Sequence, residues 1–213
     1  MKPFPVYASD VWLYRVARET VAVVEPYYYV QPGLHTTMMV NALDNQLGAF
    51  APEVVVLQVG IVDASPRALS EIERKVIARL PGFVQRLTHA FVRKSYARLI
   101  TTRKITYVSP ERFAANLDRI KQVFAPARFV VVPIGVPNEG YRRKNPLIEQ
   151  NVARYNGLLA EAFGPDLLTD IFEGDVERFY TPDHHHLSAE GHAAVAASVV
   201  RRLNGLTGAG AWT

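Results

Sequence analysis

The chain has 213 residues, of which 49% are hydrophobic and 21% charged, and this balance excludes a disordered or fibrous protein. No run of about 18 apolar residues could cross a membrane, and prolines interrupt the N-terminal segment where a secretory signal needs apolar residues, so we expect a cytoplasmic protein. The net charge is +4, and the absence of cysteine excludes disulfides, thiolate metal sites and a cysteine nucleophile.

Short apolar segments alternate with longer segments of helical periodicity along the chain. The expected strands are Pro5–Ala8, Tyr27–Val30, Val54–Val59, Arg128–Pro133 and Leu167–Asp170. The expected helices cover residues 11–20, 36–48, 70–79, 83–99, 110–124, 146–163 and 189–203. The third and fourth strands are apolar on both faces, which is typical of a parallel sheet covered by helices. The alternation predicts a three-layer α/β/α sandwich with a mostly parallel five-stranded sheet.

Three helix starts carry local signals. Ser70 and Glu73 have the spacing of a capping box, and Ser109 precedes a proline at the first helical position. Ser188 is placed to cap the last helix. We expect a single domain over residues 1–205, followed by a flexible tail at 206–213.

One segment carries most of the positive charge. Between Arg74 and Pro110 there are nine basic residues and no acidic one, whereas the rest of the chain has 15 basic and 20 acidic residues. The segment has no nucleic-acid-reading motif, so we expect no nucleic-acid partner. It is either a solvated helix face or a surface for an anionic partner, and we expect it to favour an acidic glycan or a lipid-linked phosphate.

The same basic segment has an amphipathic pattern and is expected to form a helical insertion at about 74–110. Leu80, Val84, Leu87 and Phe91 recur at intervals of three and four residues, so they share one helix face. This apolar face is expected to dock on the sandwich, or else to overhang the site as a lid.

Glycines and polar or titratable residues that could form a site follow each expected strand. In an open parallel sheet, ligands bind beyond the carboxyl ends of the strands. The corresponding segments here are Ser9–Asp10, Gly33–His35, Gly60–Asp63, Gly135–Glu139 and the stretch before the last helix. The sequence therefore predicts a ligand site at that edge of the sheet.

The strongest chemical motif is the segment Thr181–His192. Asp183 lies three residues before His186, so its carboxylate can bind the ring Nδ1 and leave Nε2 to act as a general base. The three consecutive histidines 184–186 could instead bind a metal, but adjacent residues rarely point at one centre, and we expect no metal site. His184 and His185 are expected to face solvent, and His192 to be a buried, supporting histidine.

The pattern Asp183-x-x-His186-Leu-Ser-x-x-Gly-His192 resembles the final motif of the SGNH/GDSL hydrolases, where Asp and His complete a Ser-His-Asp triad. Residues 55–63 are similar to the third motif of that family, a strand followed by Gly-x-Asn-Asp. Gln31-Pro-Gly33 resembles the second motif, whose glycine supplies an N–H to the oxyanion hole. The resemblance extends from about residue 5 to residue 203.

The resemblance implies a flavodoxin-like SGNH fold, ester hydrolysis or acyl transfer without a cofactor, and a glycan ester as substrate. The sequence Gln58–Asp63 followed by Ser65-Pro-Arg67 is similar to a subgroup associated with bacterial surface-polysaccharide loci, which implies an O-acetyl carbohydrate ester. By this resemblance the residues of the oxyanion hole and substrate pocket are Gly33, Gly60, Val62, Asp63, Arg15 and Arg67.

Two positions depart from the family pattern. The first motif should read Gly-Asp-Ser-Leu, but the chain has Ala8-Ser9-Asp10-Val11, which places Asp10 at the nucleophile position and Ser9 one residue early. Val62 stands where the third motif has Asn, so one oxyanion donor is missing, and the loss of such a donor costs about 10²–10³ in rate.

Three interpretations of the site stay open from the sequence. Ser9 attacks the ester with His186 as base, after a one-residue shift of the turn. Alternatively, Asp10 faces His186 and the protein is a catalytically silent module that binds a glycan or a protein. In the third, Asp10 itself attacks the ester or activates water.

Overall fold

The computed structural model describes residues 6–21, 25–183 and 186–208, and it shows a mixed α/β protein. Two strands, β1 (Val54–Gln58) and β4 (Arg128–Val132), pair in parallel, with Val56 opposite Val130. Both are rich in β-branched residues, which favour the pleated conformation. The expectation that these two segments form parallel strands is confirmed, with β4 largely buried and β1 only partly buried.

Helices cover both faces of this small sheet, because side chains alternate along β4. Phe129 and Val131 belong to one hydrophobic cluster, and Val130 and Val132 belong to the other. The first cluster is built with α2 (Thr36–Asn45), α7 (Pro110–Val123) and α9 (Ile148–Phe163), and the second with α1 (Trp12–Glu19) and α10 (Ala189–Gly208). The sheet therefore lies between two helical layers.

Shorter elements connect these layers. They are η1 (Ala8–Asp10), η2 (Leu47–Ala49), α3 (Ile61–Ala64), α8 (Glu139–Lys144), η3 (Gly164–Asp166) and η4 (Val176–Phe179). Of these, α3 follows β1 and α8 follows β4.

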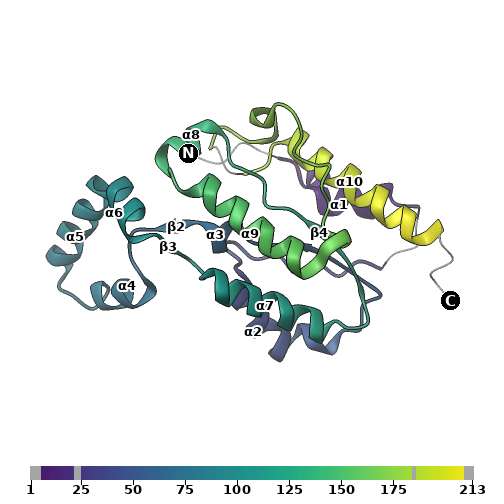
Figure 1. Ribbon diagram of the computed structural model, residues 1–213, viewed down its shortest axis with the longest axis horizontal. Coiled ribbons are helices and arrows are strands. Elements are labelled where there is room, and N and C mark those ends of the chain that lie inside the picture. Colours follow the sequence, from purple (N-terminus) through teal and green to yellow (C-terminus); the bar gives the residue numbers. More distant parts are fainter. Residues whose placement is uncertain (1–5, 22–24, 184–185, 209–213) are drawn as a thin grey trace.

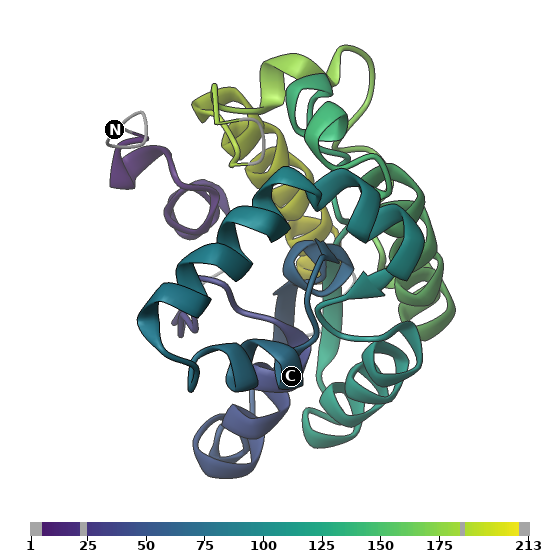
Figure 2. The same ribbon diagram turned by 90° about the vertical axis from the view of Figure 1, so that its left-hand side faces the viewer.

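The basic segment forms a separate helical arm, which we define as residues 66–106. It begins with β2 (Pro66–Arg67) and ends with β3 (Ile105–Thr106), which pair antiparallel. Between them lie α4 (Glu71–Ile77), α5 (Gly82–Lys94) and α6 (Tyr96–Arg103). Figure 1 shows these helices at one end of the molecule, and Figure 2 shows them facing the viewer from that end.

The arm differs from the single helix expected over residues 83–99. The helix breaks at Ser95, and the next residue, Tyr96, donates its hydroxyl to Pro66 O at 3.1 Å and to Asn145 Oδ1 at 2.9 Å. The break thus allows α6 to anchor the arm to the chain after α8. Its apolar residues are also divided, because Leu80 and Val84 are partly buried while Leu87 and Phe91 are exposed.

The five-stranded sheet expected from the sequence is not what the structure shows. Leu167 forms a single parallel bridge to Val131 rather than a strand, and Tyr27–Val30 pairs with no strand in the described part of the chain. The Tyr27 ring lies 4.3 Å from that of Phe50 instead. Of the first expected strand, Pro5 lies outside the described residues, and Ala8 begins η1.

Helix boundaries follow the sequence signals more closely. Ser70 and Glu73 form the expected capping box, and Ser109 caps α7 through Arg112 N at 3.3 Å. The expected tail begins later, because α10 continues to Gly208 and Leu206 packs on the cluster shared with α1. None of the helices in the described part of the chain is long and apolar enough to cross a membrane.

Candidate active site

The Asp183–His186 pair lies on a tight turn before α10. Thr181 N donates to His186 O at 2.8 Å, which closes the turn, and Tyr180 bridges to Leu187 beyond it. Asp183 Oδ2 lies 2.6 Å from His186 Nδ1, and Asp183 Oδ1 accepts from His186 N at 3.1 Å and from Thr181 Oγ1 at 2.7 Å. The carboxylate is therefore fixed on both oxygens and holds the imidazole by Nδ1.

This pairing sets the chemistry available to the ring. With Nδ1 as the donor to Asp183, Nε2 is the nitrogen that can accept a proton. The His186 side chain is 68% exposed, so a substrate in solution can reach it. The neighbouring His184 and His185, expected to face solvent, lie outside the described residues.

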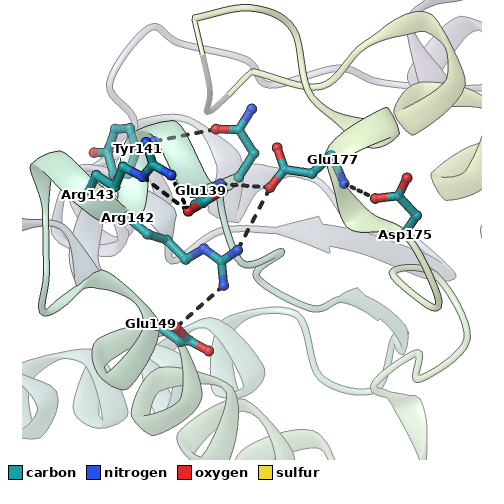
Figure 3. Close-up of polar contacts among 8 residues, drawn as sticks. Glu139, Tyr141, Arg142, Arg143, Glu149, Asp175 and Glu177 are labelled. Atoms are coloured by element: carbon teal, nitrogen blue, oxygen red, sulfur yellow. Dashed lines mark hydrogen bonds and ion pairs between the residues drawn. The ribbon is translucent and has the colours of Figure 1, made fainter.

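A polar network holds the chain that leads into this turn (Figure 3). Glu177 in η4 accepts from Glu139 N at 2.8 Å, which places its carboxylate at the N-terminus of α8. Arg142 bridges Glu177 and Glu149 at 3.8 and 3.6 Å. The segment after β4 and the segment before the Asp183–His186 turn are thereby tied together.

Ser9 and Asp10 lie in η1, ahead of α1. Ser9 is exposed, its carbonyl accepts from Arg18 Nη2 at 2.9 Å, and it lines a surface hollow of about 320 Å³ together with Tyr14 and Arg18. Among the hydrogen bonds of residues 6–21, 25–183 and 186–208, none joins Ser9 or Asp10 to the Asp183–His186 turn. The triad stays a prediction.

His192 lies in α10 and contacts the start of α1. Its Nδ1 accepts from Trp12 N at 3.5 Å, and Trp12 Nε1 donates to Gln58 Oε1 at 2.9 Å, at the end of β1. Burial lowers the pKa of His192, the Asp10 carboxylate opposes this shift, and Arg15 reinforces it. His192 is partly buried rather than buried as expected, and the charge of Asp10 acts on this histidine.

Asp63, expected in the substrate pocket, is fully buried and connects α3 to α2. Its Oδ1 accepts from Thr36 N at 2.9 Å and from Thr36 Oγ1 at 2.5 Å, and Asn116 Nδ2 donates to the same hydroxyl at 2.9 Å. Burial raises the pKa of Asp63 against these hydrogen bonds from Thr36. The carboxylate therefore caps α2 from a distant part of the chain, since the N-cap residue His35 makes no side-chain cap bond.

Two glycines named from the sequence have left-handed backbone conformations. Gly60 has φ = 112°, and a Cβ there would lie 2.4 Å from Ile134 Cδ1, so only glycine allows this close turn into α3. Gly33 has φ = 69° in an exposed turn, where a Cβ would meet nothing within 4 Å. Val62 lies partly buried in α3.

Arg67 belongs to a cluster around Tyr107 that sequence reasoning missed. The Arg67 guanidinium lies 4.3 Å from the Tyr107 ring centroid, Arg74 lies 5.4 Å from it, and the His35 ring lies 4.8 Å away. Burial lowers the pKa of His35, Asp63 and Glu71 oppose the shift, and Arg67 reinforces it. No local signal marks Tyr107, because the arm separates it from Arg67 in the sequence.

Arg15, expected in the substrate pocket, lies in α1, where its Nε is 3.3 Å from Glu19 Oε1.

Comparison with protein-family models and with curated proteins finds no match to this chain. The resemblance to the SGNH/GDSL hydrolases is therefore carried by the sequence motifs alone.

Proposed function

We propose that the protein is an SGNH-type ester hydrolase that acts on an O-acyl, in particular an O-acetyl, carbohydrate ester. The observation that carries this proposal is the 2.6 Å contact between Asp183 Oδ2 and His186 Nδ1, reinforced by two further hydrogen bonds to Asp183. An imidazole held in one tautomer by a carboxylate, with its ring exposed, is the general-base unit that acyl transfer requires.

In this proposal Ser9 is the nucleophile. Its hydroxyl attacks the acyl carbonyl while His186 Nε2 takes the hydroxyl proton, and the same nitrogen then protonates the departing sugar oxygen. Water deprotonated by His186 hydrolyses the acyl-enzyme. If a second sugar hydroxyl replaces that water, the same site carries out acyl transfer. No cofactor takes part in either sequence.

The surroundings of Tyr107 support an acidic substrate. Arg67 and Arg74 converge on one ring, and the ion pairs of the described residues include neither of them. Two guanidinium groups without a carboxylate partner are suited to a carboxylate or phosphate on the glycan. In this proposal Arg67 and Arg74, rather than the basic residues farther out on the arm, account for the preference for acidic substrates.

A second candidate is a silent glycan- or protein-binding module. It is favoured by the position of Asp10, which stands where the family has serine and whose charge acts on His192. In that case the Asp183–His186 pair binds a ligand without breaking a bond.

Hydrolysis of p-nitrophenyl acetate and of an O-acetylated acidic glycan separates these candidates. We expect Ser9→Ala and His186→Ala each to lower turnover by about 10³-fold or more, and the double variant to be hardly worse, because triad members act as a unit. Asp10→Ala is the matched control and should retain turnover. Wild-type turnover in Ser9→Ala with loss in Asp10→Ala would transfer the chemistry to Asp10, and no turnover in the wild type would favour the binding module.

A further inference from the structure

The outer side of the helical arm carries an exposed apolar stripe on α5. Phe83, Leu87 and Phe91 are 61%, 68% and 62% exposed, and no residue of α5 is buried. Their spacing of four residues puts them on one side of the helix, along a line of about 12 Å. Val84, Thr88 and Val92, each about 100° further round the helix, are partly buried.

The neighbouring helix α4 repeats this pattern. Ile72 and Val76, also four residues apart, are 75% and 50% exposed. Large apolar side chains rarely stand this far out of a protein at regular helical spacing without a partner. The arm therefore presents apolar anchors on two helices.

Positive charge accompanies the anchors. From Glu71 to Lys104 the chain has nine basic and two acidic residues, a net charge of +7. Both acidic side chains are already paired, Glu71 with Lys75 at 2.6 Å and Glu73 with Arg103 at 2.9 Å. Seven exposed basic side chains take part in none of the ion pairs of the described residues: Arg74, Arg79, Arg86, Arg93, Lys94, Arg98 and Lys104.

We infer that the helical arm docks flat on an anionic lipid surface. Phe83, Leu87 and Phe91 enter the boundary between headgroups and acyl chains, and the arginines and lysines beside them contact lipid phosphates and carboxylates. A helix with phenylalanine and leucine on one face and basic residues flanking it has the composition of an interfacial anchor. The net charge of −3 on the rest of the chain keeps the main body away from the same surface.

Charge decides between this surface and a second copy of the chain. Two arms packed face to face would bring the unpaired cations of both copies together, which opposes association. An anionic bilayer neutralises them. The arm that carries the stripe protrudes at one end of the molecule (Figure 1), as insertion into a lipid interface requires.

Co-sedimentation of the full chain with vesicles tests the inference. The probes are vesicles of phosphatidylcholine alone and of phosphatidylcholine with 30% phosphatidylserine. We expect binding to the anionic vesicles only, weakened by high salt. Neutralising Arg86, Arg93 and Lys94 with Gln should lower the partition coefficient about 100-fold, since each cation near an anionic surface contributes about fivefold. Replacing Phe83, Leu87 and Phe91 with Gln should lower it at least about tenfold.

A matched control neutralises three exposed basic residues outside the arm, Arg112, Arg128 and Arg154, with Gln, and it should bind like the wild type. Circular dichroism confirms that each variant is folded. Equal losses in the control and arm variants, or no wild-type binding, would overturn the inference. Light scattering that shows a wild-type dimer and a monomeric stripe variant would assign the stripe to self-association. Binding to poly-L-glutamate that requires the basic residues but not the apolar stripe would show instead that the arm binds an acidic protein.

Discussion

Replacement of Asp63 separates its structural role from the substrate contact that the family resemblance implies. In Asp63→Ala, Thr36 N and Thr36 Oγ1 both lose their acceptor, and because Thr36 is fully buried, water does not replace it. Each buried donor left without a partner costs about 1–3 kcal/mol. Removal of a buried carboxylate offsets part of this, so we expect a net loss of about 3 kcal/mol, or a Tm lower by about 6–12 °C.

The matched variant is Asp63→Asn, which keeps an oxygen acceptor for Thr36. Because burial raises the folded-state pKa of Asp63, the wild type has its full stability from this group below the unfolded value of about 3.9. That stability is lost as the pH rises through the folded pKa. We therefore expect the free energy of unfolding of Asp63→Asn to rise relative to that of the wild type between pH 4 and pH 7.

Urea unfolding of the three proteins at pH 4, 5.5 and 7 measures these differences, and p-nitrophenyl acetate turnover is recorded in parallel. An unfolding free energy for Asp63→Ala within about 0.5 kcal/mol of the wild type would refute the capping role. A stable Asp63→Asn variant that has lost turnover would show instead that Asp63 contacts the substrate.

Other substitutions probe the edge of the sheet. Val62→Asn adds a side-chain N–H and should raise ester turnover about tenfold; a less stable variant with unchanged turnover would mean that Val62 only packs. Gly60→Ala should cost about 2–4 kcal/mol in thermal unfolding, because φ is 112° and the Cβ meets Ile134; an unchanged Tm would contradict this. Because the pKa of His192 is lower in the folded state, the unfolded chain takes up this proton at a higher pH than the folded protein. The free energy of unfolding therefore falls as the pH drops below about 6.5. Urea unfolding at several pH values should show a smaller fall for His192→Gln.

Features that depend on residues close in the sequence could be predicted. The Ser70–Glu73 capping box forms because its partners are three residues apart, and the Asp183–His186 contact forms within one turn for the same reason. The apolar strand segments before Gly60 and Ile134 were also predictable, because a strand buried on both faces needs apolar side chains on both.

Features that depend on distant partners could not be predicted. Tyr27–Val30 has the composition of a strand, but the structure pairs it with none, and Tyr27 packs on Phe50 instead. The exposure of Leu87 and Phe91 could not be predicted either. Periodicity shows that residues share a helix face, but it does not show whether another element covers that face.

The sequence by itself determined the helix starts, the two parallel strands and the Asp183–His186 pair. Only the tertiary structure decided that Asp63 caps α2 and that Arg67 and Arg74 meet at Tyr107. Thr36 lies 27 residues from Asp63, and the helical arm separates Arg67 from Tyr107 along the chain. Contacts of this kind arise when whole elements pack, because burial and hydrogen bonding then act between side chains that no local pattern relates.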